Sequence, residues 1–548
     1  MDSISARLPK NKYLTMAVLI TANLLNYMDR YTVAGVLTDL QDYFTMTDKQ
    51  SGLLQTVFIV FYMICAPVCG YLGDRYNRKL IMTVGLSVWI AAVLASTYAG
   101  RDQYWIFLYC RALVGVGEAS YSTIAPTIIA DIFTGRSRTT WLSVFYLMIP
   151  LGSGLGFAIG SNVSNYMGMW QWGIRLTLVL GVVCLLMIIF LMENPERGAA
   201  DHAKHQVTSL REDLLYLLGH KTFLCTTCGL TAVIFATGAL AWWTPTLVEH
   251  RYRMIHGGVS DAEKMTIATI FGVLTAVGGF VGVVLGSFIA EIWREGKWFF
   301  PQSLRSHVYV CAIGSLVGLP FLIATLMLCD VDMYTTWVTL FIAITFMCFN
   351  WAVNTDVLLT VVVAHRRSLA NSIQTMVSHA FGDAASPYLV GAISDAIKTS
   401  GTNVTAYDAY FGLRNALFLP TGVLLFSIAG FLAAALFVVA DTHETEEQNS
   451  LVTTECRIKI IKNNNTGLKR VEFQTVGLQI FMGQRNLYMR KQGELAILVV
   501  ELGLRPPIEQ AFLQAPVVLR LSYGDAILQV DADVLVLQGE LRMLEHLH

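Results

Sequence analysis

The chain has 548 residues, of which 55% are apolar and only 14% are charged, and its formal net charge is −1. Soluble domains carry roughly 25% charged residues, so a chain this poor in charge requires lipid as a second solvent. The same figures exclude a disordered chain and a nucleic-acid-binding protein, because these need a high net charge or a basic surface.

A helix that crosses a bilayer needs about 20 apolar residues, and about twelve segments meet this requirement. We expect each to be helical, because backbone polar groups in hydrocarbon must be satisfied within the segment. In chain order the predicted helices lie near residues 14–37, 51–71, 80–98, 104–126, 139–163, 173–192, 223–247, 266–292, 307–328, 335–360, 368–396 and 413–440. The predicted fold class is therefore an all-α integral membrane protein.

A polar and charged stretch divides these segments six and six, as expected for two packed bundles joined by a linker. The predicted organisation is an N-terminal segment 1–13, a bundle 14–192, a linker 193–222, a bundle 223–440 and a tail 441–548. Short apolar runs in the tail are too short to span a bilayer. We expect the tail to be largely disordered, with weak strand or helix tendencies.

Basic residues outside the predicted helices gather on one side, which predicts that both termini and the linker are cytoplasmic. The tripeptide that begins at Asn403 matches a glycosylation acceptor and falls in an outside loop, in agreement with this orientation.

The segment GYLGDRYNRK, residues 70–79, ends the second predicted helix. Gly70 and Gly73 allow another helix to approach, and Asp74 can accept from the N–H groups of a helix N-terminus. The basic residues of the segment anchor the turn and can pair with carboxylates; they are Arg75, Arg78 and Lys79. We interpret the segment as a latch between bundles, because a simple positive-inside turn does not explain the glycine and aspartate spacing.

This segment resembles the signature loop of the major facilitator superfamily. RALVGVGEA (residues 111–119) resembles a second motif of that superfamily, and PLGSGLGFAIG (150–160) resembles the glycine-rich motif of proton antiporters. Four further segments resemble the Spinster family of lysolipid transporters: residues 26–37, 117–127, 145–156 and 378–395. The resemblance covers about residues 14–440. It implies the major facilitator fold and transport of lysophospholipids or sphingosine-1-phosphate, with coupling to protons.

Four charged residues lie deep within predicted helices, where charge is costly and usually functional. They are Asp29 and Arg30 in the first helix and Arg111 and Glu118 in the fourth. We expect them to converge on one polar cavity, where arginine suits a phosphate head group. The carboxylates can hold the arginines when substrate is absent and can take a proton. The alternative is a buried ion-pair network without substrate contact.

Further candidates for substrate binding or proton coupling lie in other helices. His379 and Asp383 lie in the eleventh helix, where a histidine can gate coupling or simply be hydrogen-bonded within the bundle. Asn350 and Asn354 in the tenth helix can line the cavity, although interhelical hydrogen bonding explains them equally well. Tyr146 is a further candidate for the cavity lining.

Glycines follow a proline in the fifth predicted helix, at Pro150, Gly152, Gly154 and Gly156. They make the helix narrow and flexible, so we interpret this segment as a hinge. Close packing of another helix against these glycines is compatible with a hinge.

The hypothesis from sequence is a secondary active transporter of lysolipids that works by alternating access. No ATP-binding loop or nucleophile elbow is found, so we expect no enzymatic activity, no cofactor and no bound metal. The expected partners are a lysolipid substrate, protons and the bilayer, without nucleic acid, and the expected state is a monomer. The expected location is the lysosomal or late endosomal membrane or the plasma membrane. The alternatives are a non-transporting lipid sensor or receptor and a carrier of a polar organic solute.

Overall fold

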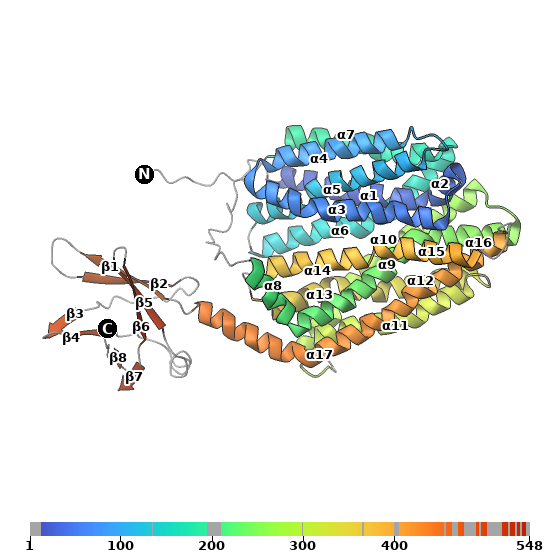
Figure 1. Cartoon of the computed structure of the whole chain (residues 1–548). Coiled ribbons are helices and arrows are strands. Elements are labelled where there is room, and N and C mark those ends of the chain that lie inside the picture. Colours follow the sequence, from blue (N-terminus) through green and yellow to red (C-terminus); the bar gives the residue numbers. More distant parts are fainter. Residues whose placement is uncertain are drawn as a thin grey trace. The chain divides into compact units, whose positions relative to one another are not determined.

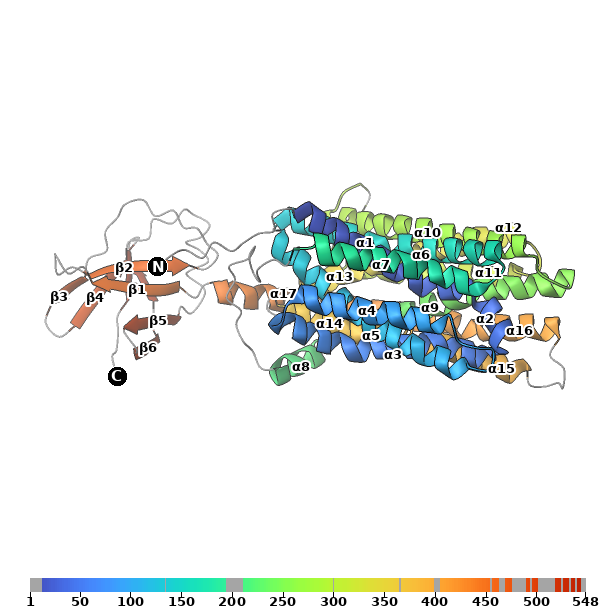
Figure 2. The ribbon, with the colours of Figure 1, turned by 90° about the horizontal axis from the view of Figure 1, so that it is seen from above.

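The structure is a computed structural model that describes residues 12–133, 135–193, 210–298, 300–363, 366–398 and 405–453, and strands in the tail. The chain forms two compact units, Met1–Asp441 and Thr442–His548. The first unit contains the helices that the sequence predicts to cross the membrane, and they run side by side (Figures 1 and 2).

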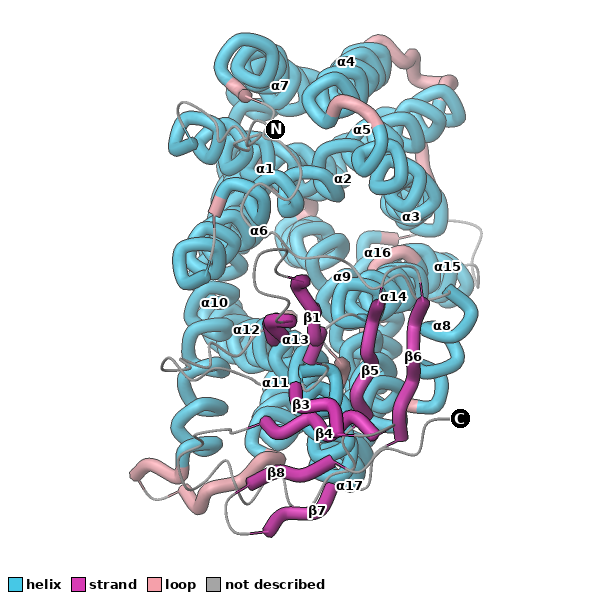
Figure 3. The backbone as a smooth tube through the Cα atoms, turned by 90° about the vertical axis from the view of Figure 1, so that its left-hand side faces the viewer, coloured by secondary structure: helices cyan, strands magenta, loops and turns pink. Residues whose placement is uncertain are grey.

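The first half of this unit consists of α1 (Lys12–Gly35), α2 (Leu37–Phe44), α3 (Asp48–Arg75), α4 (Arg78–Ser96), α5 (Tyr104–Ile132), α6 (Gly135–Met167) and α7 (Trp170–Leu191). The short helix α8 (Leu210–Gly219) lies in the linker. The second half consists of α9 (Lys221–His256), α10 (Asp261–Glu295), α11 (Ser306–Leu328), α12 (Met333–Met347), α13 (Phe349–Val361), α14 (Arg367–Phe381), α15 (Ala385–Lys398), α16 (Ala406–Ala416) and α17 (Phe418–Thr453). Figure 3 views these helices from one end.

Each of the twelve predicted segments coincides with one long helix or with two consecutive helices, which confirms the all-α membrane fold. Within the described residues, nine helical segments are long and apolar enough to cross a membrane. The remaining predicted segments correspond to α1, α5 and the α14–α15 pair, and each of them contains two of the charged or titratable candidate residues. The short helices α2 and α8 were not predicted, because neither has the length of a bilayer span.

Helix ends follow local sequence signals. Thr47 and Gln50 form a capping box at the start of α3, and Ser260 and Glu263 form another at the start of α10. Gly296 ends α10 in the left-handed conformation, which glycine adopts without the steric penalty of a side chain. We call the end of the bundle with the α3–α4 and α7–α8 connections inner and the end with α2 outer, following the expected orientation.

Helix α6 packs between α1 in its own half and α10 in the other half. A Cβ atom at Gly154 would stand 2.5 Å from the carbonyl oxygen of Gly272 in α10, and one at Gly152 would stand 2.6 Å from that of Leu24 in α1. Pro150 lies within the continuous helix and faces Gly279. The predicted hinge segment therefore provides the close packing that joins the two halves, and its role as a hinge stays a prediction.

The described segments of the second unit include eight strands, in a region for which we expected only weak strand or helix tendencies. They are β1 (Cys456–Lys462), β2 (Lys469–Thr475), β3 (Met489–Gln492), β4 (Leu495–Val500), β5 (Val518–Tyr523), β6 (Ala526–Asp531), β7 (Val534–Leu537) and β8 (Glu540–Met543). They form two four-stranded sheets, with strand orders β2-β1-β5-β6 and β3-β4-β8-β7. None of the predicted site residues lies in this unit.

Candidate functional site

The four predicted charged residues meet within the first half as two ion pairs. Arg111 Nη1 lies 3.6 Å from Asp29 Oδ2, and Arg30 Nη2 lies 3.5 Å from Glu118 Oε2. All four side chains are buried, with Asp29 0% and Arg30 6% exposed. Because an unpaired charge at this depth is very costly, the reciprocal pairing of α1 with α5 makes the burial tolerable.

The Asp29–Arg111 pair is enclosed by further helices of the first half. Trp89 on α4 donates to Asp29 Oδ2 at 3.2 Å, and Thr177 on α7 donates to Asp29 Oδ1 at 2.7 Å. Among the described residues, Arg111 Nε and Nη2 have no hydrogen-bond partner. This pair therefore holds α1, α4, α5 and α7 together at one point.

Aromatic rings surround the Arg30 guanidinium. Its central carbon lies 4.7 Å from the ring centroid of Phe58, 5.2 Å from that of Tyr27 and 5.8 Å from that of Tyr62. The same Phe58 ring lies 5.2 Å from the Arg111 guanidinium. A cation over an aromatic face is attracted by the ring quadrupole, so Phe58 supports both arginines from one position on α3.

The partner of Arg30 is itself tied to α1. The Asn26 amide lies against the Glu118 carboxylate and the Tyr121 hydroxyl, and in the orientation that satisfies these groups its nitrogen donates to the carboxylate and, 2.7 Å away, to the hydroxyl. Arg30 Nε has no hydrogen-bond partner among the described residues. Arg30 thus retains one donor that a further acceptor can use.

The eleventh predicted helix is interrupted next to two candidate residues. Helix α14 ends at Phe381 and α15 begins at Ala385, and the Ala384 carbonyl in the break accepts from Thr56 on α3. His379 Nδ1 and Asp383 Oδ1 are 2.8 Å apart. An interrupted helix with a charged residue at the break is typical of transporter binding sites.

Of the three remaining candidates for the cavity lining, one is exposed and two are buried. Tyr146 on α6 is half exposed. Asn350 is fully buried and donates to the Met347 carbonyl at 3.1 Å and to Ser315 Oγ on α11 at 3.4 Å, and Asn354 donates to Gln374 Oε1 on α14 at 2.8 Å. The structure thus places both asparagines in hydrogen bonds inside the second half, which is the interhelical alternative, and does not bring them to the charged residues.

The basic residues of the inner loop bind within the first half. Arg78 pairs with Asp131 on α5, and Lys79 Nζ donates to the carbonyl of Met192 at 2.9 Å. The Arg75 guanidinium lies over its own helix, on the ring of Tyr71. These contacts fix the loop to its own bundle, and none of them reaches the second half.

The glycines of this loop differ in their surroundings. A Cβ atom at Gly73 would touch Ile124 on α5, whereas within the described part of the chain nothing lies within 4 Å of one at Gly70. Gly70 thus makes no close helix contact in this state. The side chain of Asp74 lies outside the described residues, so the latch stays a prediction. Asn403, the predicted glycosylation site, also lies outside the described residues.

Sequence reasoning missed the partners of the four charges. Asn26 lies one helical turn from Arg30, and this spacing places both residues on one face of α1. The spacing could therefore have identified Asn26 as a neighbour of the charged residues. Phe58, Trp89 and Thr177 lie on three other helices, where an aromatic residue or a threonine is equally typical of ordinary packing. Only the assembled bundle identifies them.

Comparison with known proteins places the chain in a family. The model of the Major Facilitator Superfamily matches residues 19–387, a range that contains both ion pairs and the break between α14 and α15. Protein spinster homolog 3 of Danio rerio is 43% identical over 454 residues, which cover 82% of this chain and 88% of the relative. The chain belongs to the Spinster family of the major facilitator superfamily.

Other Spinster relatives give the same result. Protein spinster homolog 1 of Homo sapiens is 41% identical over 455 residues, covering 81% of this chain and 85% of the relative. A Mus musculus protein named sphingosine-1-phosphate transporter SPNS2 is 39% identical over 452 residues, covering 81% of each chain. These matches confirm the resemblance that the motifs indicated, and the chain is a multi-pass membrane protein.

A solved structure agrees with this fold. A bacterial homolog of Spinster in an inward-facing and occupied conformation has a TM-score of 0.67 at 18% identity, covering 79% of this chain and 99% of that chain. The likeness shows that the Spinster chain has the major facilitator fold.

Proposed function

We propose that the chain is a secondary transporter of lysolipids that works by alternating access. The observation that carries the proposal is the helix break between α14 and α15 in the second half, where the Ala384 carbonyl accepts a hydrogen bond from Thr56 of the first half. A binding site between the two halves is what alternating access requires. The relative named as a sphingosine-1-phosphate transporter supports a lysolipid as the substrate.

The two ion pairs have different roles in this proposal. Arg30 contacts the phosphate of the lysolipid, because its Nε has no hydrogen-bond partner among the described residues. Guanidinium groups bind phosphate through two parallel hydrogen bonds. The Asp29–Arg111 pair is enclosed by α4 and α7 and positions α1, so it supports the site without contacting substrate.

Glu118 links substrate binding to protons in this scheme. In the structure Glu118 holds Arg30, so a phosphate that recruits Arg30 leaves the buried carboxylate without its ion-pair partner. A buried carboxylate that loses its cation favours the protonated form. Lysolipid release should therefore change with an imposed pH gradient, and Glu118→Gln should flatten that response.

The site opens toward the inner side in our proposal. Asn371 and Thr375 on the inner half of α14 are exposed, although polar groups are unfavourable against lipid. Exposure of such residues supports an aqueous approach from that side. We further propose that the inner side is cytoplasmic, that the chain is a monomer, and that it resides in the lysosomal or late endosomal membrane or in the plasma membrane. Accessibility of a tag at each terminus in sealed vesicles tests the orientation.

Flux measurements test the proposed function. Vesicles containing the protein are loaded with labelled lysophosphatidylcholine, lysophosphatidylethanolamine, sphingosine-1-phosphate or a sugar, and release is followed for the parent and for Arg30→Gln. We expect saturable release of at least one lysolipid, reduced tenfold or more by Arg30→Gln and unaffected by Arg101→Gln at an exposed loop position. Binding without release would indicate a sensor, and release of the sugar alone would indicate a carrier of polar solutes.

A further inference from the structure

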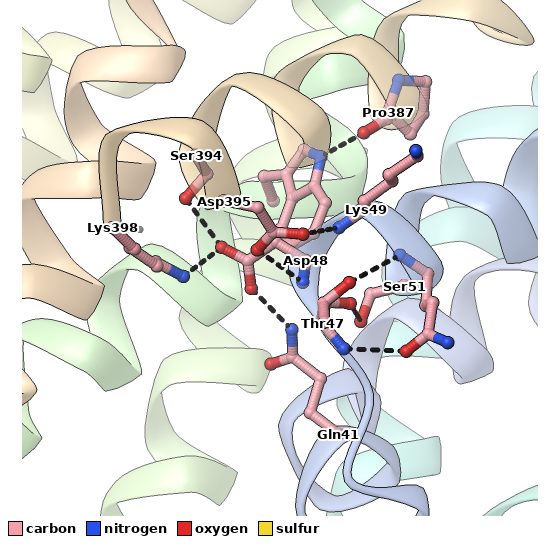
Figure 4. Close-up of polar contacts among 11 residues, drawn as sticks. Gln41, Thr47, Asp48, Lys49, Ser51, Pro387, Ser394, Asp395 and Lys398 are labelled. Carbon is pink, nitrogen blue, oxygen red and sulfur yellow. Dashed lines mark hydrogen bonds and ion pairs between the residues drawn. The ribbon is translucent and has the colours of Figure 1, made fainter. Parts of the chain in front are cut away.

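The outer ends of the two halves are joined by a helix cap that crosses between them. Asp395, near the outer end of α15, accepts hydrogen bonds from the backbone N–H groups of Asp48 at 3.1 Å and Lys49 at 2.8 Å (Figure 4). These N–H groups begin α3 and have no partner within their own helix. A carboxylate at this position also interacts favourably with the helix dipole. The second half thus caps a helix of the first half.

The contact is reciprocal, because the Asp48 side chain binds back to α15. Its carboxylate accepts from the Ser394 hydroxyl at 2.6 Å and pairs with Lys398, while Gln41 donates to it from α2 at 2.9 Å (Figure 4). Asp48 is only 4% exposed. Two carboxylates, one from each half, therefore accept hydrogen bonds from the opposite half where the outer ends touch.

Glycines make this approach possible. A Cβ atom at Gly391 on α15 would overlap the Asp48 carbonyl, and one at Gly52 on α3 would overlap the carbonyl of Pro387. Trp243 on α9 donates to the same Pro387 carbonyl at 3.0 Å. The two helix backbones thus meet without intervening side chains.

Other ion pairs reinforce the same end. Helix α2 contacts the second half through Asp39, which pairs with Lys264 on α10, and through Asp42, which lies 2.7 Å from Arg253 on α9. The two halves therefore touch at the outer ends of several helices, and the contact does not depend on one isolated hydrogen bond.

The α15 segment has the same residue spacing as the inner loop. In Gly391–Asp395 a glycine is followed by a small residue at the third position and an aspartate at the fourth, as in Gly70–Asp74. Helix α3 ends at the inner side and α15 ends at the outer side, so the two segments lie at opposite ends of the bundle. The described contacts of Arg78 and Lys79 in the inner loop, by contrast, stay within the first half.

We propose that Gly391–Asp395 is an outer counterpart of the inner signature loop and that its cap on α3 locks the outer face closed. Asp395 and Gly391 are positioning residues in this inference: they set the balance between outer-closed and outer-open molecules and do not contact substrate. The inference rests on alternating access from the proposed function.

The test measures the distance between the outer ends in bilayers without lysolipid. Spin labels are attached at Asp102 in the first half and Tyr334 in the second, both exposed outer positions, after replacement of the native cysteines. The variants are Asp395→Asn, which removes charge without steric change, and Gly391→Ala. The matched control is Thr47→Ala, which removes the cap that the first half itself supplies to the same helix.

We expect a single short outer distance in the parent and in Thr47→Ala. Asp395→Asn and Gly391→Ala should raise the ratio of long to short distances by about tenfold, as expected for the loss of hydrogen bonds to a charged group. An unchanged distribution in Asp395→Asn, or the same shift in Thr47→Ala, would overturn the inference. The distance measurement needs no substrate, so its result does not depend on lysolipid flux. Failure of flux in the parent would refute the proposed function, whereas an unchanged outer distance in Asp395→Asn would refute only this inference.

Discussion

Replacement of Asp29 by asparagine tests whether the Asp29–Arg111 pair is a buried ion pair. Asp29 is fully buried and accepts from Trp89 and Thr177 as well as pairing with Arg111. Asparagine keeps an acceptor oxygen but removes the charge, so Arg111 remains as an uncompensated buried cation. Breaking a buried pair in this way costs about 3–5 kcal/mol of the free energy of unfolding.

The size of the interaction follows from a double-mutant cycle. Arg111→Met alone leaves the Asp29 carboxylate unpaired, at a similar cost of about 3–5 kcal/mol. The double variant removes both charges, so its cost should fall below the sum of the single costs by about 2–3 kcal/mol. This difference measures the pairwise coupling.

The assay is unfolding in mixed micelles with increasing dodecyl sulfate, followed by tryptophan fluorescence. The exposed Lys297–Glu295 pair provides the control, and Lys297→Met should leave the unfolding curve unchanged because solvent screens that pair. Single changes that cost less than about 1 kcal/mol, or strictly additive costs in the double variant, would refute the reasoning about this pair.

Two further predictions concern Phe58 and Gln374. Phe58→Leu removes the ring face shared by Arg30 and Arg111 and should weaken lysolipid binding about threefold or more, whereas Phe58→Tyr should preserve it; equilibrium binding of a labelled lysolipid checks both. Gln374→Leu leaves the buried amide nitrogen of Asn354 without its described acceptor and should cost about 1–3 kcal/mol in the same unfolding assay, with an unchanged KM for flux. A raised KM would instead place this hydrogen bond in the substrate site.

The sequence was sufficient for the membrane fold and for the existence of the buried charges. Span lengths depend only on bilayer thickness, and charges such as Asp29 and Glu118 stand out in apolar helices because of their cost. Which arginine pairs with which carboxylate was not predictable, because it depends on the rotation of α1 against α5. The same holds for Phe58, whose role exists only where three helices meet.

Helix ends were less predictable than helix cores. Asp48 and Asp395 lie at the ends of predicted spans, where carboxylates are common and carry no signal of a contact 347 residues apart in the chain. The break after Phe381 was not predicted, although Gly382 and Pro387 lie next to it, because it depends on tertiary hydrogen bonds such as that from Thr56. For Asn354 the sequence left two roles open, and its partner Gln374 supports the interhelical one.

The most direct test of the central claim compares the affinities of sphingosine-1-phosphate and sphingosine, which lacks the phosphate, for the parent and for Arg30→Gln. Hydrogen bonds from a charged donor are worth about 1.5–3 kcal/mol, so the parent should prefer the phosphorylated lipid by about tenfold or more. Arg30→Gln should abolish most of this preference while retaining affinity for sphingosine. An equal preference in the parent and the variant would contradict the assignment of Arg30 to the phosphate.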